Sequence, residues 1–138
     1  MNTNATTRVT TTPSLKLDLL KGFVGRCPHC GKGHLFRAFL KVADRCSACG
    51  EEFFHHQADD FPAYLVIVVV DHVIAAALLT VEAWRLFSAA TEAAIFIPLT
   101  LVFSLALLQP MKGAVVALQW HLGMHGFQAA RLARETGA

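Results

Sequence analysis

Two pairs of cysteines are the residues of this sequence whose type and spacing point most clearly to chemistry. Each pair has the form Cys-x-x-Cys, and fifteen residues separate the first pair, Cys27 and Cys30, from the second, Cys46 and Cys49. Two residues between cysteines let one tight turn direct both sulfurs at the same ion, and two such turns complete a tetrahedron. The spacing therefore predicts a closed, structural metal site of the zinc-ribbon type.

A glycine follows each pair, at Gly31 and Gly50. A residue there usually needs a left-handed backbone, which glycine adopts without steric cost. We expect Zn²⁺ as the ion, and iron in a rubredoxin-like site is the alternative that uses the same ligands. Two disulfides are not favoured, because they would need an oxidising compartment and this segment is expected in the cytoplasm. A thioredoxin-like redox pair is not favoured either, because it would need a strand-to-helix context that the sequence lacks.

The stretch between the cysteine pairs is expected to form two short strands and a miniature core. Its apolar side chains are Leu35, Phe36, Phe39, Leu40 and Val42. A core this small cannot stabilise a domain alone, so metal binding would contribute most of the folding free energy. Four thiolates fill the coordination shell, and His29 and His34 are therefore expected on the surface.

Asp71 and His72 form a second candidate site, because they lie near the middle of a long apolar run. Ionisable residues within a membrane span usually face a partner or a water-filled cavity. One interpretation is a proton, metal or haem-related site. The other is a structural hydrogen bond from a protonated Asp71 to Thr100 or Ser104 on the next apolar segment.

Two further clusters of histidines and carboxylates invite a metal interpretation. His55, His56, Asp59 and Asp60 could ligate a second metal, but a polar linker whose aspartates cap the following helix is the favoured interpretation. His121 and His125 are four residues apart, as on one face of a helix. Without a third ligand, an interfacial structural role is favoured for this pair.

The elements that must position these residues are mainly helical. Hydrophobic residues make up 54% of the chain and charged residues 16%, well below the roughly 25% of a typical soluble domain. Residues 61–81 and 88–108 are each apolar enough for a spanning helix of about 20 residues. Residues 59–109 are therefore predicted to form a two-helix transmembrane hairpin, in which Pro98 kinks the second helix and Gln109-Pro110 ends it.

The remaining segments complete a mainly α membrane protein with a small zinc-ribbon-like β knuckle. Residues 1–14 are predicted to be a disordered tail, because they contain no apolar run, and residues 15–58 to be the zinc-ribbon-like domain. Residues 110–134 are predicted to form an amphipathic helix that lies in the membrane interface or packs on the first two helices, with a third span as the alternative. The partners implied are membrane lipid and other membrane proteins.

The positive charges predict the orientation in the membrane. Eight of the twelve Lys and Arg residues precede residue 61, one lies between the two apolar segments, and three follow Pro110. Positive residues stay on the cytoplasmic side, so both termini are expected there, in a bacterial inner membrane. The net charge of +2, without clustering of basic and aromatic residues, argues against a nucleic-acid partner.

Several motifs together resemble the bacterial domain-of-unknown-function family 983. They are Gly25-Arg26-Cys27-Pro28-His29-Cys30-Gly31-Lys32-Gly33-His34-Leu35-Phe36, Cys46-Ser47-Ala48-Cys49-Gly50, Asp59-Asp60-Phe61-Pro62-Ala63 and Leu108-Gln109-Pro110-Met111-Lys112-Gly113. The resemblance extends from about Leu15 to Phe127. Phe61 and Asp71 depart from it, since a small residue is expected at both positions. The resemblance implies a role in the biogenesis of respiratory haem–copper oxidases, or as a small accessory subunit, because members often lie beside genes for oxidase subunits and assembly factors.

The sequence contains no nucleophile elbow, phosphate loop or paired carboxylates, so we expect a protein that is not an enzyme. The leading hypothesis is an accessory or assembly protein whose ribbon docks a cytoplasmic partner and whose hairpin packs against an oxidase subunit or assembly factor. The alternative is a rubredoxin-like redox or metal-handling membrane protein. A transporter would require oligomers, because two helices alone cannot enclose a pathway.

Overall fold

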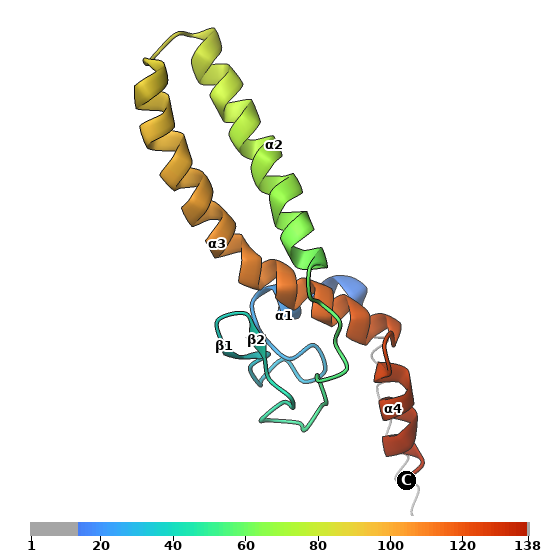
Figure 1. Ribbon diagram of the computed structural model, residues 1–138. Helices are drawn as coiled ribbons and strands as arrows, with labels where there is room; N and C mark the ends of the chain where they lie inside the picture. Colours follow the sequence, from blue (N-terminus) through green and yellow to red (C-terminus); the bar gives the residue numbers. More distant parts are fainter. Residues whose placement is uncertain (1–13, 138) are drawn as a thin grey trace, which may run out of the picture.

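The computed structural model describes residues 14–137, so the tail predicted for residues 1–14 lies almost entirely outside the described residues. The elements in order are α1 (Leu15–Phe23), β1 (Phe36–Ala38), β2 (Lys41–Val42), α2 (Phe61–Ala83), α3 (Ala89–Leu122) and α4 (Phe127–Glu135). Figure 1 shows α2 and α3 as a long hairpin, with α1, the strands and α4 gathered at its open end. The prediction of a mainly helical fold with two long apolar helices is confirmed.

The helix α2 begins almost where the sequence predicts and has 23 residues, so it is about 35 Å long. This exceeds the roughly 30 Å of a bilayer's hydrocarbon core. Pro62 lies in the first turn, where its missing N–H costs nothing. The predicted capping is wrong, because the side chain of Asp60 makes no capping hydrogen bond, and Asp59 and Asp60 are both exposed.

The helix α3 corrects the prediction that Gln109-Pro110 ends the second span. It is one helix of 34 residues that contains both Pro98 and Pro110. A proline removes one backbone hydrogen bond and bends a helix, but burial of the residues that follow stabilises the continuation. Figure 1 shows α3 changing direction in its lower half, near the level of α1.

The predicted amphipathic helix over residues 110–134 is therefore divided between two elements. Its first part belongs to α3, which ends at Leu122 because Gly123 adopts a left-handed conformation with φ of 67°. Its second part is the short helix α4.

The predicted zinc-ribbon-like domain, residues 15–58, begins with a helix, α1, that the sequence does not indicate. Nine residues are too few for a stable isolated helix, so α1 depends on its packing against α3. The two backbones touch at Gly22 and Gly113, where a Cβ on either residue would collide with the other's carbonyl oxygen. Asp18, only 3% exposed, accepts a 2.8 Å hydrogen bond from Nδ1 of His121 and joins the helices a second time.

The knuckle, residues 25–58, shares one core with α3. The predicted miniature core is partly right: Leu35 and Val42 are buried, but Phe39 is 58% exposed. The core is completed by residues from elsewhere in the chain; its buried members are Cys27, Leu35, Val42, Cys46, Phe53, Ala58, Val115 and Val116. The knuckle is thus packed onto α3 rather than joined to it only through the chain.

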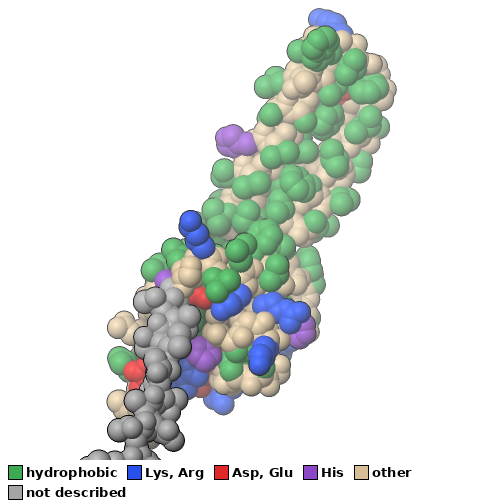
Figure 2. Space-filling view, turned by 180° about the vertical axis from the view of Figure 1, so that it is seen from behind, with side chains coloured by type: hydrophobic (Ala, Val, Ile, Leu, Met, Phe, Trp, Pro, Cys, Tyr) green, Lys and Arg blue, Asp and Glu red, His purple; other side chains and the backbone are tan. Residues whose placement is uncertain are grey.

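Both long helices keep most of their apolar side chains exposed. Their best windows have mean hydropathies of 2.3 for α2 and 2.0 for α3, with only 11% and 6% of the residues buried. A core helix of a soluble protein would bury such residues. Figure 2 shows the hydrophobic side chains covering the hairpin, while Lys and Arg side chains gather mainly at its open end.

Candidate metal centre

The four cysteines converge at the expected site. Their Sγ atoms all lie within 4.8 Å of one another, and within residues 14–137 they are the group of ligand side chains close enough to share one ion. The Cys27–Cys49 and Cys30–Cys46 sulfur pairs are 3.8 and 3.7 Å apart. A tetrahedron with metal–sulfur bonds of about 2.3 Å has edges of about 3.8 Å, so the spacing fits a four-coordinate ion. Disulfides would need sulfurs about 2.05 Å apart, and all four cysteines are free.

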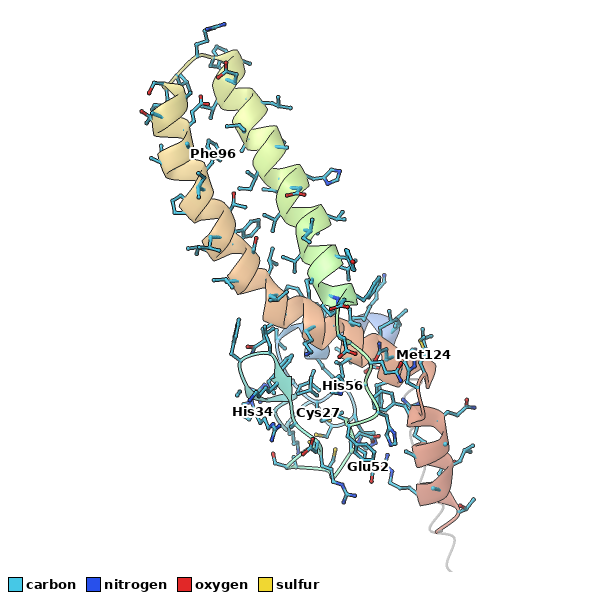
Figure 3. The ribbon with its side chains drawn as sticks, in the orientation of Figure 1. Cys27, His34, Glu52, His56, Phe96 and Met124 are labelled. Carbon is cyan, nitrogen blue, oxygen red and sulfur yellow. The ribbon has the colours of Figure 1, made fainter. Side chains whose placement is uncertain are left out.

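The two turns that carry the ligands have the predicted geometry. Gly31 and Gly50 have φ of 69° and 74°, and their N–H groups donate to the carbonyl oxygens of Cys27 and Cys46. The N–H groups of Lys32 and Ala48 point at the sulfurs of Cys30 and Cys46 at 3.4 Å. Such N–H···S contacts stabilise thiolates. Figure 3 shows Cys27 inside the knuckle and His34 on its outside, and His29 is also exposed, as predicted.

The surroundings of the sulfurs favour a bound cation over four free thiolates. Burial raises the pKa of the Cys27 thiol and of the Cys49 thiol. Burial also opposes ionisation of Cys30, but hydrogen bonds from the N–H groups of Gly33 and Lys32 and from the Cys49 and Cys46 side chains together lower the pKa of Cys30 to about 6. An ion that binds here must therefore displace protons and supply the positive charge that four thiolates require.

Gly33 is a part of the centre that the spacing of the cysteines does not reveal. A Cβ at this position would collide with the sulfur of Cys46 and would lie 3.4 Å from the Cβ of Ala48. Only a residue without a side chain lets the first loop approach the second ligand turn this closely.

The Gly33→Ala variant is accordingly expected to bind the metal at least about tenfold more weakly, as is typical when the surroundings of metal ligands are disturbed. Competition with a chromogenic chelator measures the affinity. The exposed neighbour Lys32 provides the control, and Lys32→Ala should match the unaltered protein. Equal affinities for both variants would show that Gly33 does not constrain the centre.

A polar cavity adjoins the four-cysteine cluster, and the spacing of the cysteines does not reveal it either. It has a volume of about 400 Å³ and is lined by His29, Glu51, Trp120, Arg131, Arg134 and Glu135. Glu51, 1% exposed, accepts a 2.5 Å hydrogen bond from Arg134, which raises the pKa of that guanidinium. Glu51 follows the second cysteine pair by two residues, so this ion pair ties α4 to the metal-binding turn.

Asp71 and His72 lie on the exposed surface of α2. The predicted hydrogen bond from Asp71 to Thr100 or Ser104 is absent among the described residues, and the Thr100 hydroxyl donates instead to the carbonyl oxygen of Phe96. The Nδ1–H of His72 donates to the carbonyl oxygen of Val68 at 2.7 Å. The two side chains therefore face outward, away from the rest of the chain.

The remaining histidines have structural contacts. His55 contacts Glu52 at 3.3 Å and packs against Phe127, and His56 donates to the carbonyl oxygen of Phe53 at 2.7 Å. Within residues 14–137, these two histidines and the exposed Asp59 and Asp60 do not form a group of side chains close enough to share a metal ion.

His121 and His125 do not share a helical face, contrary to the sequence-based expectation. The helix α3 ends at Leu122, and His125 lies in the following turn with φ of 51°. His121 instead pairs with Asp18. The two residues are 103 positions apart in the chain, so no local sequence pattern indicates this contact.

Comparison with known proteins agrees with the motifs of the sequence. The family model described as "Protein of unknown function (DUF983)" matches residues 36–120, which is more than half of the chain. The match includes the second cysteine pair, all of α2 and most of α3. No curated protein and no solved structure matches the chain.

Proposed function

The chain belongs to the DUF983 family, and we propose that it is a non-enzymatic membrane accessory or assembly protein. In this proposal the metal centre is a rigid docking module fixed to a two-helix membrane anchor. The observation that carries it is the shared core, in which Val115 and Val116 of α3 belong to the same cluster of buried side chains as Cys27 and Cys46.

A second set of contacts supports the rigid connection. The backbone N–H of Gln57, just before α2, donates to Oε1 of Gln119 at 3.0 Å, and Nε2 of Gln119 donates to the carbonyl oxygen of Gln57 at 3.1 Å. These bonds fix the knuckle against α3 near the start of α2. A partner bound to the knuckle would therefore be held in a defined orientation relative to the membrane helices.

Zinc is the proposed occupant of the metal centre. Four thiolates complete a tetrahedral shell and leave no open position for a substrate, which is the arrangement of structural zinc sites. The ion would hold the two cysteine turns together and neutralise their charge. Iron with the same ligands would make the protein coloured and redox-active, and this is the alternative function.

The proposed setting is the inner membrane of a bacterium, with both ends of the chain in the cytoplasm. The distribution of Lys and Arg supports this orientation. The exposed apolar surfaces of α2 and α3 support insertion. A reducing cytoplasm would keep the four cysteines available as thiolate ligands.

Two surfaces suit the two kinds of partner. The polar cavity between the knuckle and α4 would receive a cytoplasmic protein. Within the membrane, an apolar groove on α3, lined by Phe96, Ile97, Thr100, Leu101 and Ser104, would receive a helix of another membrane protein. The family resemblance supplies the proposed identity of that protein, a haem–copper oxidase subunit or an assembly factor.

Purification of the full chain from native membranes in mild detergent tests this function. The proposal predicts oxidase subunits or haem-insertion factors in the eluate, together with a haem spectrum from those partners. An Ile97→Trp variant, which fills the groove of α3, should lose these proteins, whereas Trp84→Phe in the loop should retain them. An eluate without haem and without respiratory proteins would refute the proposed function.

A further inference from the structure

The face of α2 that carries Asp71 and His72 points directly away from α3. The buried residues of α2 are Pro62, Val66 and Val70, and α3 is the helix that packs against α2. Successive residues of a helix are about 100° apart, so Val66 and Val70 lie on the side opposite to Asp71 and His72. The hairpin itself therefore leaves this face uncovered.

The same angular spacing defines the centre of the exposed face. Val68 and Ala75 lie midway between Asp71 and His72 around the helix, one turn below and one turn above them. Val68 is 55% exposed, and Ala75 is also exposed. A small residue at this position lets a neighbouring helix approach closely. The centre of the face is apolar, and one polar side chain stands on each flank.

Both polar groups need a partner if α2 spans a membrane. A carboxyl or imidazole group facing lipid near the bilayer centre is energetically costly. His72 already donates from Nδ1 to Val68, which leaves Nε2 to accept a hydrogen bond from outside the chain. A protonated Asp71 carboxyl group is a donor of the kind that Nε2 requires.

We propose that this face binds the same face of a second copy of the chain, so that Asp71 of each copy pairs with His72 of the other. Two copies with the same orientation in a membrane are related by a two-fold axis along the membrane normal. This axis brings the flank that carries Asp71 in one copy against the flank that carries His72 in the other. The acid and the base thus meet twice, and Val68 and Ala75 pack along the axis.

The charge pattern favours a second copy over an unrelated helix. An adjacent acid and base at nearly the same height make the face complementary to itself, whereas an unrelated partner would have to supply both a donor and an acceptor. The dimer leaves the groove on α3 free for the proposed oxidase or assembly partner. The inference rests on the membrane placement in the proposed function.

Two tags on separate copies, expressed together, test the dimer in native membranes. Asp71→Leu and His72→Leu should each reduce co-purification of the second tag roughly tenfold, because each removes both hydrogen-bonded pairs. Leucine makes the span more apolar, so insertion is preserved, and an unchanged metal content confirms that the knuckle is folded. The double variant Asp71→His with His72→Asp restores the complementary pattern and should recover co-purification.

Cross-linking provides a second readout. Under a membrane-permeant oxidant, Val68→Cys should give a disulfide-linked dimer, whereas Ile97→Cys, 69% exposed on α3, should give at least tenfold less. Equal cross-linking of the two variants, or co-purification that the leucine variants do not change, would overturn the dimer. Co-purifying copies in an eluate without respiratory proteins would support the dimer while refuting the proposed oxidase role.

Discussion

Replacing Cys27 by serine is expected to abolish stable metal binding and to unfold the knuckle. Cys27 is fully buried, so serine would remove a thiolate ligand and place a hydroxyl group in an apolar core. Structural zinc contributes about 10–16 kcal/mol of apparent binding free energy in small zinc-finger peptides, more than a core of this size supplies. Because Val115 and Val116 share that core, the side chains of the second half of α3 that pack on the knuckle should become exposed as well.

Metal analysis together with limited proteolysis measures both consequences. The variant should hold less than about a tenth of the metal of the unaltered protein, and new cleavage sites should appear within residues 25–58. Ser47→Ala is the matched control, since Ser47 is exposed between the ligands Cys46 and Cys49. If Cys27→Ser retained full metal content and the original cleavage pattern, Cys27 would not be a ligand.

Replacing Gly113 by leucine is expected to detach α1 from α3. A Cβ at Gly113 would collide with the carbonyl oxygen of Gly22 and would lie 3.2 Å from the ring of Phe36. Backbone atoms cannot rotate away as side chains do, so the destabilisation should reach or exceed the roughly 1–3 kcal/mol typical of overpacked cores. The variant should therefore have a lower Tm than the unaltered protein.

Trypsin cleavage at Lys16 and Lys21 reports the release of α1 independently of the Tm. Ala114→Leu is the matched control, because Ala114 lines an open apolar groove beside Leu19, Leu20 and Phe23 that accommodates a larger side chain. Equal protection of α1 in both variants would show that the contact between Gly22 and Gly113 does not hold the helix.

The features that the sequence predicted correctly depend on local patterns. The cysteine spacing with its following glycines predicted the two tight turns that bring the four sulfurs together, since a tight turn is determined by residues close in the chain. The two apolar runs predicted the long helices, because length and hydropathy are sums over one segment. His29 and His34 were correctly placed on the surface by the same local reasoning about a complete coordination shell.

The features that it missed depend on contacts between distant residues. Pro110 normally ends a helix, and only the packing of α1 and the knuckle on the following residues shows why α3 continues. The same holds for α1, whose nine residues are helical because Gly22 meets Gly113 and Asp18 meets His121. The aspartates before α2 matched a capping pattern, but the backbone of Asp60 is helical and its side chain caps nothing.

The metal content of the full chain, extracted from the membrane fraction in mild detergent, tests the proposed zinc-stabilised membrane anchor most directly. One zinc ion per chain in a colourless preparation is the expected result, because four thiolates complete the shell of a single tetrahedral ion. A chain that is recovered from the membrane without metal, or with iron and the corresponding colour, would contradict a structural zinc centre, and the iron-containing preparation would favour a redox function.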